Sequence, residues 1–233
     1  MRCVECKPGD GAAEIETGSA GASAQREYER RRGAREDRVK AQLGNLIGGF
    51  ALAVTGEPHS TRAWERGSIG EQKLAKALAE IHDLTVLNDR RVPRTRGNLD
   101  HIVIAPAGVF VVDAKHYKGL IQIRDRGGLF SRDQRLYVGS RDCSSLADNM
   151  GWQLSAVRGA LESAGIDLAA IPVTPVLCFI EGEWPLLLPP ESYKGVRLEG
   201  SRSIKALLTK SNVLNRDQME RVSRVLAVAF PAK

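Results

Sequence analysis

The stretch GVFVVDAKHYKG at residues 108–119 is an apolar β-strand that runs directly into two charged residues. Side chains on a strand alternate between the two faces of a sheet, so Asp113 and Lys115 share one face. Charges at the end of a buried strand are costly unless they are paired, hydrated or bound to a metal ion. The stretch therefore indicates either an exposed ion pair where the strand leaves the core or one half of a functional site.

A second apolar strand, LDHIVIA at residues 99–105, precedes this stretch, and the turn signal PAG at 106–108 separates the two. If the strands pair antiparallel, with the last residue of one facing the first residue of the other, Asp100 lies directly opposite Asp113. A three-residue loop would shift this register by one. The sequence therefore predicts a β-hairpin that brings two carboxylates together.

Two carboxylates directly opposite each other have Cβ atoms about 4.5–5.5 Å apart, and they repel unless a positive group lies between them. Lys115, two residues along the same face, supplies part of that positive charge. A divalent cation would supply the rest, since Mg²⁺ binds through one or two carboxylates and keeps several water ligands. The hairpin thus predicts a cation site, and an ion-pair cluster at the strand edge is the alternative.

The composition is that of a globular protein with a mild excess of positive charge. The formal net charge of +6 and the pI of about 9.3 favour polyanionic partners such as nucleic acid, or an anionic membrane surface. Four scattered cysteines without a preceding secretory signal argue against a disulfide scaffold, so we expect a reducing, cytoplasmic location. The apolar segment at 43–54 is shorter than the roughly 18–20 residues that a membrane span needs.

The residue pattern divides the chain into four parts. We expect a disordered tail at 1–24; a basic helix, an apolar glycine-rich segment and a linker at 25–66; a globular domain at 67–183; and a C-terminal helical extension, packed on that domain, at 184–233. Helices are predicted at 69–81, 145–165, 201–211 and 216–230, and strands at 84–89, 99–105, 108–115, 120–124, 135–140 and 174–180. This order predicts an α/β fold, a mixed sheet flanked by helices with an N-terminal helical appendage.

The N-terminal part holds three features that admit more than one interpretation. Cys3 and Cys6 have the spacing of half a zinc site, but the other two cysteines lack a neighbour at that spacing. The basic helix at 26–40 is typical of a solvated face, with docking of nucleic acid or of a partner as the alternative. The glycines of 43–54 would let this segment pack against another helix, in the same chain or in a homodimer, and contact with a membrane surface is the weaker alternative.

Three motifs taken together resemble the nuclease-related domain (NERD) family of the PD-(D/E)xK nuclease superfamily. They are GSIGEQKLAKAL at 67–78, LDHIVIAPAGVF at 99–110 and VVDAKHYKG at 111–119. The resemblance covers roughly residues 67–180 and implies a restriction-endonuclease-like core. One position departs from the superfamily motif, because Leu99 stands where a proline would precede the first aspartate.

The resemblance also implies a set of site residues. Asp100 corresponds to the first metal carboxylate, and Asp113 and Lys115 correspond to the acidic residue and the lysine of the D/E-x-K triplet. Glu71 corresponds to the acidic residue of the first helix and is expected as a third metal ligand, either direct or through a water molecule, while Gln153 is the candidate for the glutamine of the helix that follows the sheet. The implied cofactor is Mg²⁺, or Mn²⁺, and the implied substrate is nucleic acid, with DNA as the expected polymer.

Phosphodiester hydrolysis needs an activated water and positive charge near the phosphoryl oxygens, both of which a metal ion provides. A protonated Lys115 would orient the water or stabilise the transition state, whereas a desolvated, neutral Lys115 would act as a base. Other basic residues are expected to contact phosphates, which position a substrate without reading its bases. These candidates are Lys118, Arg90, Arg91, Arg94 and Arg96.

Several of these residues also have a purely structural interpretation. Glu71 fits a capping box whose N-cap is Ser68, and Gln153 fits an ordinary polar position on a helix. His101 alternates to the face opposite Asp100, so we expect it to be structural.

The sequence as a whole predicts a metal-dependent nuclease-like protein. The first alternative is a nucleic-acid-binding module of the same fold that has lost turnover. The second is a scaffold that docks through residues 25–54.

Overall fold

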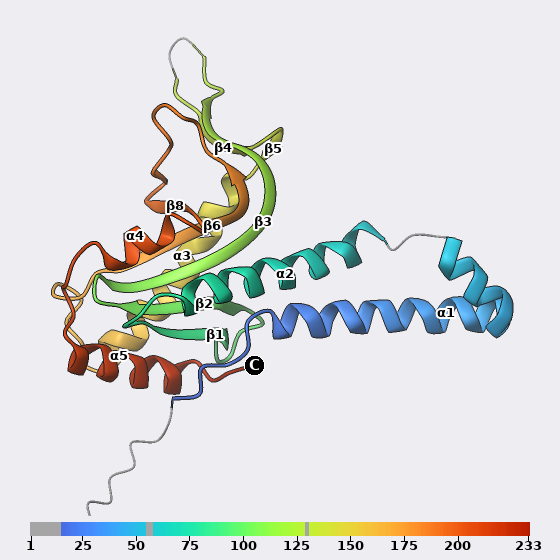
Figure 1. The fold of residues 1–233 in the computed structure, drawn as a ribbon, viewed down its shortest axis with the longest axis horizontal. Helices are drawn as coiled ribbons and strands as arrows, with labels where there is room; N and C mark the ends of the chain where they lie inside the picture. The colour runs from blue at the N-terminus through green and yellow to red at the C-terminus, as the bar shows by residue number, and fades with distance from the viewer. Residues whose placement is uncertain (1–14, 55–57, 129–130) are drawn as a thin grey trace, which may run out of the picture.

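The computed structural model describes residues 15–54, 58–128 and 131–233. In this part of the chain a mixed, eight-stranded sheet lies between helices on both of its faces (Figure 1). The strands are β1 (Thr85–Arg91), β2 (Asn98–Ala105), β3 (Gly108–Asp125), β4 (Gln134–Val138), β5 (Arg141–Asp142), β6 (Val173–Glu183), β7 (Ser192–Tyr193) and β8 (Val196–Gly200). The helices are α1 (Ala22–Val54), α2 (His59–Ala79), α3 (Ser144–Ser163), α4 (Ile204–Thr209) and α5 (Arg216–Ala229). The predicted α/β class is confirmed.

The strand order in the sheet is β1-β2-β3-β6-β8-β7. The first three strands form an antiparallel meander, and β6 and β8 continue the sheet parallel to β3. The far end of β3 pairs with β4, which in turn pairs with β5. Helix α3 then crosses over one face of the sheet and returns the chain to β6, as a parallel β-α-β connection requires.

The β2–β3 hairpin has the register that the sequence predicts. Ala105 faces Gly108, and the pairing continues to His101 opposite Val112, so the next pair along is Asp100 and Asp113. The turn depends on Gly108, because its φ of +133° lies in a region that side chains disfavour. A Cβ at this position would also lie 2.7 Å from the carbonyl oxygen of Pro172.

Strand β3 is longer than predicted. The two strands expected at 108–115 and 120–124 are one strand of 18 residues, with an irregularity between Lys115 and Lys118. Pairing with β6 resumes after this β-bulge, which is why the strand does not end there. Bulges bend a strand and re-aim its side chains, and this one follows Lys115 directly.

Each face of the sheet has its own hydrophobic core. On one face α2 and α4 contribute Leu74, Leu78 and Leu208, which pack against inward-facing residues such as Phe110 and Val112. On the other face α3 and α5 bury a larger cluster that includes Met150, Val157, Leu161, Val222 and Leu226. Because both faces are covered, the central strands are apolar on both sides where they pass between the helices.

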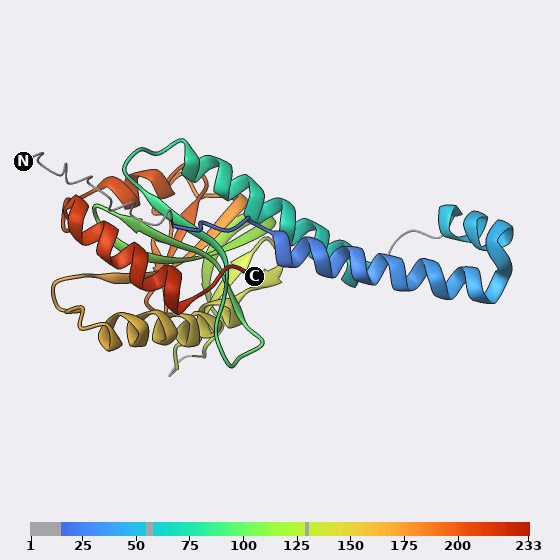
Figure 2. The same cartoon turned by 90° about the horizontal axis from the view of Figure 1, so that it is seen from below.

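The N-terminal part differs from the prediction of a tail up to residue 24. Residues 15–21 run along β1, where the amide of Asn88 donates to the carbonyl of Thr17 (2.7 Å), and α1 begins at Ala22. Helix α2 begins at His59, so most of the linker predicted after residue 54 is helical. Helices α1 and α2 lie side by side and project beyond the sheet as an arm (Figures 1 and 2).

Other features of the N-terminal part stay predictions. The backbone of 43–54 is helical after a break at Gly44, but its side chains from residue 45 onward lie outside the described residues, as do Cys3 and Cys6. Homodimer packing and scaffold docking through this segment are therefore untested. Among the helices in the described ranges, none combines the length and the apolar character that a membrane crossing requires.

The C-terminal part also differs from the prediction, because residues 184–233 are not only a helical extension. Strand β8 pairs parallel with β6, from Val176 opposite Arg197 to Phe179 opposite Gly200, so these residues complete the sheet. The short length of β7 and β8, two and five residues, explains why their pattern does not stand out in the sequence.

Arg90 does not fit the predicted contact with phosphate. Its side chain is buried, and its guanidinium donates to the carbonyl oxygens of Phe230 (2.6 Å), Glu16 (2.8 Å) and Ala227 (3.0 Å). Arg90 therefore joins β1 to the N-terminal segment at 15–21 and to the C-terminal end of α5, where backbone carbonyls lack helical partners.

We expect Arg90→Ala to lower the free energy of unfolding by about 3 kcal/mol or more, since each buried carbonyl left unpaired costs about 1–3 kcal/mol. The neighbouring Arg91 is exposed, so Arg91→Ala should change stability by no more than about 0.5 kcal/mol. Urea unfolding followed by circular dichroism compares the two variants. Equal stabilities would contradict the structural role of Arg90.

Candidate active site

Four of the predicted site residues meet at one end of the sheet. Glu71 comes from α2, Asp100 from the start of β2, and Asp113 and Lys115 from β3 just before its bulge. Glu71, Asp100 and Lys115 line a cavity of about 1060 Å³ between the arm and the sheet, and Asp113 is buried at 6% exposure. The structure thus brings the three carboxylates and the lysine of the prediction together.

Lys115 forms a hydrogen-bonded ion pair with Asp113. Burial on its own would favour a neutral lysine, but the charges of Asp113 and Asp100 outweigh it and raise the pKa of Lys115. The ammonium group is therefore protonated at neutral pH. This favours the electrostatic role of Lys115 over its role as a general base.

Asp100 carries negative charge that the lysine does not balance. Burial, together with the nearby carboxylates of Asp113 and Glu71, raises the pKa of Asp100 well above its ordinary value. Lys115 acts in the opposite direction but does not compensate. An excess of buried negative charge of this kind is relieved by taking up a proton or by binding a cation.

Glu71 is buried on the side of α2 that faces the N-terminal segment. Its Oε2 accepts a hydrogen bond from the backbone amide of Gly21 (3.0 Å). Burial and the charge of Asp89 raise the pKa of Glu71 to about 7. The predicted capping box with Ser68 is wrong, because Ser68 lies well inside α2 and its hydroxyl donates to the carbonyl of Gly21 (3.2 Å).

Asp89 is a buried acid beside the site that the sequence reasoning missed. Its Oδ2 accepts from the amide of Ser23 (2.6 Å), and its Oδ1 accepts from the Ser23 hydroxyl (2.7 Å) and from Asn98 Nδ2 (3.1 Å). Asp89 and Glu71 thus hold the first residues of α1, where negative charge favours a helix N-terminus. The sequence does contain a pattern that could indicate Asp89. The apolar run LTVLND at 84–89 ends in an aspartate, as the apolar run GVFVVD at 108–113 does.

Gln153 is buried on α3, among the residues that face the core. Its Oε1 has no hydrogen-bond partner among the described residues. With this oxygen unpartnered there, no hydrogen bond from it reaches the four clustered residues, and the role of Gln153 stays a prediction.

His101 has the environment of a structural histidine. It is fully buried, its ring Nδ1 lies 2.8 Å from Asn88 Oδ1, and burial lowers its pKa to about 4. A neutral ring that is fixed by a neighbouring strand fits the structural interpretation.

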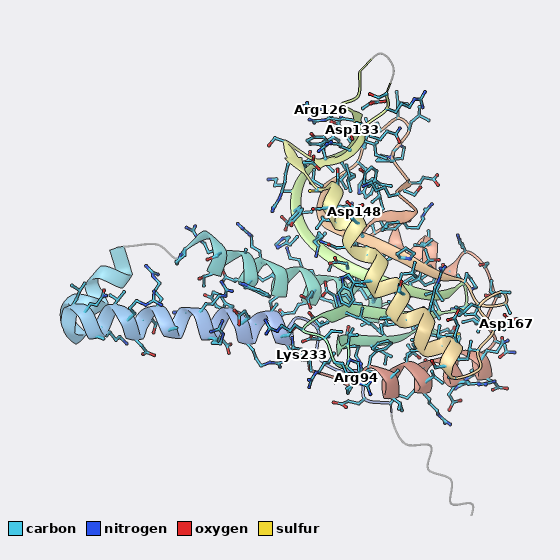
Figure 3. The ribbon with its side chains drawn as sticks, turned by 180° about the vertical axis from the view of Figure 1, so that it is seen from behind. Arg94, Arg126, Asp133, Asp148, Asp167 and Lys233 are labelled. Carbon is cyan, nitrogen blue, oxygen red and sulfur yellow. The ribbon has the colours of Figure 1, made fainter. Side chains whose placement is uncertain are left out.

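Of the basic residues predicted to contact phosphate, Arg96 lines the cavity. Lys118, Arg91 and Arg94 are exposed but are not among its lining residues. The cavity also contains arginines that were not predicted as site residues: Arg26, Arg30 and Arg31 of α1, Arg66 of α2 and Arg141 of β5. Lys233, which lies beside the start of α1, lines it too (Figure 3).

The donor chemistry suits a hard cation, but the side chains are not arranged as a complete metal site. Within the described ranges, no group of three or more His, Cys, Asp or Glu side chains is placed to hold a metal ion. Glu71 is already engaged by Gly21, which leaves Asp100 and Asp113 as the pair of carboxylates at the site. Two carboxylates with water as the remaining ligands fit Mg²⁺; a direct site of three carboxylates does not fit.

Comparison with known proteins gives the family of the central segment. The family model of NERD, the nuclease-related domain, matches residues 66–180. This segment is a nuclease-related domain. Among curated proteins and among solved structures, no match is found.

The nuclease-related domain runs from the middle of α2 to β6, so it includes all four clustered residues and Gln153. Helix α1, whose arginines form one side of the cavity, lies outside it.

The raised pKa of Glu71 predicts how the stability of the metal-free protein depends on pH. Folded protein holds a proton on Glu71 between pH 4.5 and about 7, where the unfolded chain does not, so the free energy of unfolding falls as the pH rises through this range. The loss amounts to about 3 kcal/mol at most. Glu71→Gln keeps an acceptor for Gly21 but cannot ionise, and it should remove this component.

Urea unfolding in EDTA, at several values between pH 4.5 and 8, measures this difference. Glu80→Gln is the matched control, because Glu80 is an exposed residue next to the same helix. If Glu71→Gln and wild type keep a constant difference in stability across the range, Glu71 does not have a raised pKa.

Proposed function

We propose that this protein is a divalent-metal-dependent nuclease that hydrolyses phosphodiester bonds in nucleic acid, with DNA as the expected polymer. The observation that carries the proposal is the excess of carboxylate charge, wholly or partly buried, at the base of a cavity whose walls are rich in arginine. The carboxylates suit a metal ion and the arginines suit phosphates. The match of residues 66–180 to a nuclease-related domain supports the same conclusion.

Each clustered side chain has a role in this proposal. Asp100 and Asp113 would hold Mg²⁺, or Mn²⁺, which supplies an activated water and offsets charge on the phosphate. Lys115, kept protonated by the two aspartates, stabilises negative charge that develops on the phosphoryl oxygens. Glu71 would act on the metal through a water molecule, since its Oε2 accepts from Gly21. Gln153 is the remaining candidate.

We expect Asp113→Asn and Lys115→Ala to lower the rate of cleavage by about 100-fold or more, as removal of one transition-state donor does in other enzymes. Cleavage of labelled single-stranded and duplex DNA and of RNA, with Mg²⁺, with Mn²⁺ and with EDTA, measures this effect. Asp148→Asn and Lys76→Ala are matched controls, because both residues are exposed and lie outside the cavity. If neither site variant changes the cleavage of any substrate, the proposed active site is wrong.

A nucleic-acid-binding module without turnover is the second candidate. It is favoured by the engagement of Glu71 with Gly21 and by the absence of a three-carboxylate metal group in the described part of the chain. Wild-type protein that binds nucleic acid with a steep salt dependence, but cleaves nothing with either metal, would establish this alternative.

A further inference from the structure

We propose that the cavity beneath the arm binds a single-stranded stretch of nucleic acid, with phosphates on the arginines of α1 and α2 and bases stacked on Trp64 and Tyr117. The proposal rests on the proposed function only for the class of polymer. It assigns a binding surface to α1, which lies outside the nuclease-related domain.

The arm is a fixed wall of this cavity. The start of α1 is tied to the site twice, because the amide of Gly21 donates to Glu71 and Ser23 donates to Asp89 with both its amide and its hydroxyl. Helices α1 and α2 then run side by side away from these contacts (Figure 2). The arginines of the arm are therefore held at the same cavity as Asp100 and Lys115.

The wall presents positive charge that a phosphate backbone can use. Arg26 and Arg30 are one helical turn apart, about 6 Å along the axis, and Arg66 faces the same cavity from α2. Glu27 pairs with Arg30 (2.7 Å) and Arg31 (2.5 Å), which are exposed or half-exposed. Surface ion pairs of this kind contribute little stability, so a phosphate can replace the carboxylate. The lining as a whole carries more cations than anions.

Two aromatic side chains in the same cavity distinguish a single strand from a duplex. Trp64 is 40% exposed, and the guanidinium of Arg31 lies 5.5 Å from its ring centroid. Tyr117 has the same arrangement with Arg141, at 4.5 Å. Trp64 is exposed, whereas Tyr117 is half-buried at the edge of the core. A basic groove with accessible aromatic rings is the arrangement that binds unpaired nucleotides, because their bases are free to stack. In a duplex the faces of the bases are already stacked on each other.

The shape of the surface argues against an anionic membrane as the partner. The arginines line a concave cavity of about 1060 Å³ that also contains Glu71 and Asp100. A lipid surface is too flat to contact side chains inside such a cavity. Acidic groups at the base of the cavity would also repel anionic headgroups.

Stacking is tested by fluorescence anisotropy with a labelled 12-nucleotide DNA and its duplex, using full-length Asp113→Asn protein so that no cleavage occurs. We expect the single strand to bind more tightly than the duplex, Trp64→Ala to weaken its binding about tenfold and Trp64→Phe to retain most of the affinity. Trp152→Ala is the control, because Trp152 is 42% exposed but does not line the cavity. Thermal melts establish that each variant is folded.

The phosphate contacts are tested by the salt dependence of the same binding. Arg26→Ala combined with Arg30→Ala should reduce the slope of log K against log salt by about 1.4, since each contact with single-stranded phosphate contributes about 0.7. Arg38→Ala combined with Lys40→Ala removes the same charge from exposed positions of α1 outside the cavity and should leave the slope unchanged.

Three results would overturn the inference: duplex binding at least as tight as that of the single strand, an unchanged affinity in Trp64→Ala, or an unchanged slope in the double arginine variant. Binding to phosphatidylserine vesicles that depends on Arg26 and Arg30, without binding to the oligonucleotide, would assign the arm to a membrane instead. Failure of the proposed function is recognised separately, because wild-type protein would then bind the single strand in this manner and not cleave it.

Discussion

Repulsion among closely spaced carboxylates, most of them buried, is the constraint on which this structure depends. Asp100 and Asp113 are neighbours across the β2–β3 hairpin, and Glu71 and Asp89 approach the same end of the sheet from α2 and β1. One ion pair with Lys115 does not balance these charges. The fold tolerates them because backbone amides, a seryl hydroxyl and an open cavity surround them. The same imbalance makes this end of the sheet suited to a cation.

Much of the core could be predicted from the sequence because it depends on local rules. Alternation of apolar residues and a tight turn fix the register of the hairpin, and that register alone places Asp100 against Asp113. The bulge in β3 could not be predicted, because continued pairing with β6 decides whether the strand ends, and β6 lies some 60 residues farther along the chain.

The errors concern residues whose partners are distant in sequence. Arg90 and Arg91 are identical neighbours in the sequence. The buried guanidinium of Arg90 donates to carbonyls at the C-terminal end of α5, whereas Arg91 is exposed to solvent. Strand β8 is stable only as an addition to β6. The small, polar residues of 1–24 are typical of a tail, but residues 15–24 are held by contacts with Asn88, Asp89 and Glu71, which no local pattern reveals.

The carboxylate of Glu71 accepts a hydrogen bond from Gly21, just before the arm helix α1, and also lines the cavity of the candidate site. This hydrogen bond stabilises the ionised form of the Glu71 carboxylate. Because coupling between two equilibria is reciprocal, ionisation of Glu71 stabilises the observed position of α1 by the same free energy. The protonation of Glu71 in the nuclease-related domain and the position of a helix outside that domain are therefore thermodynamically linked. A change at the start of α1 can alter the protonation of Glu71 without touching any other residue of the site.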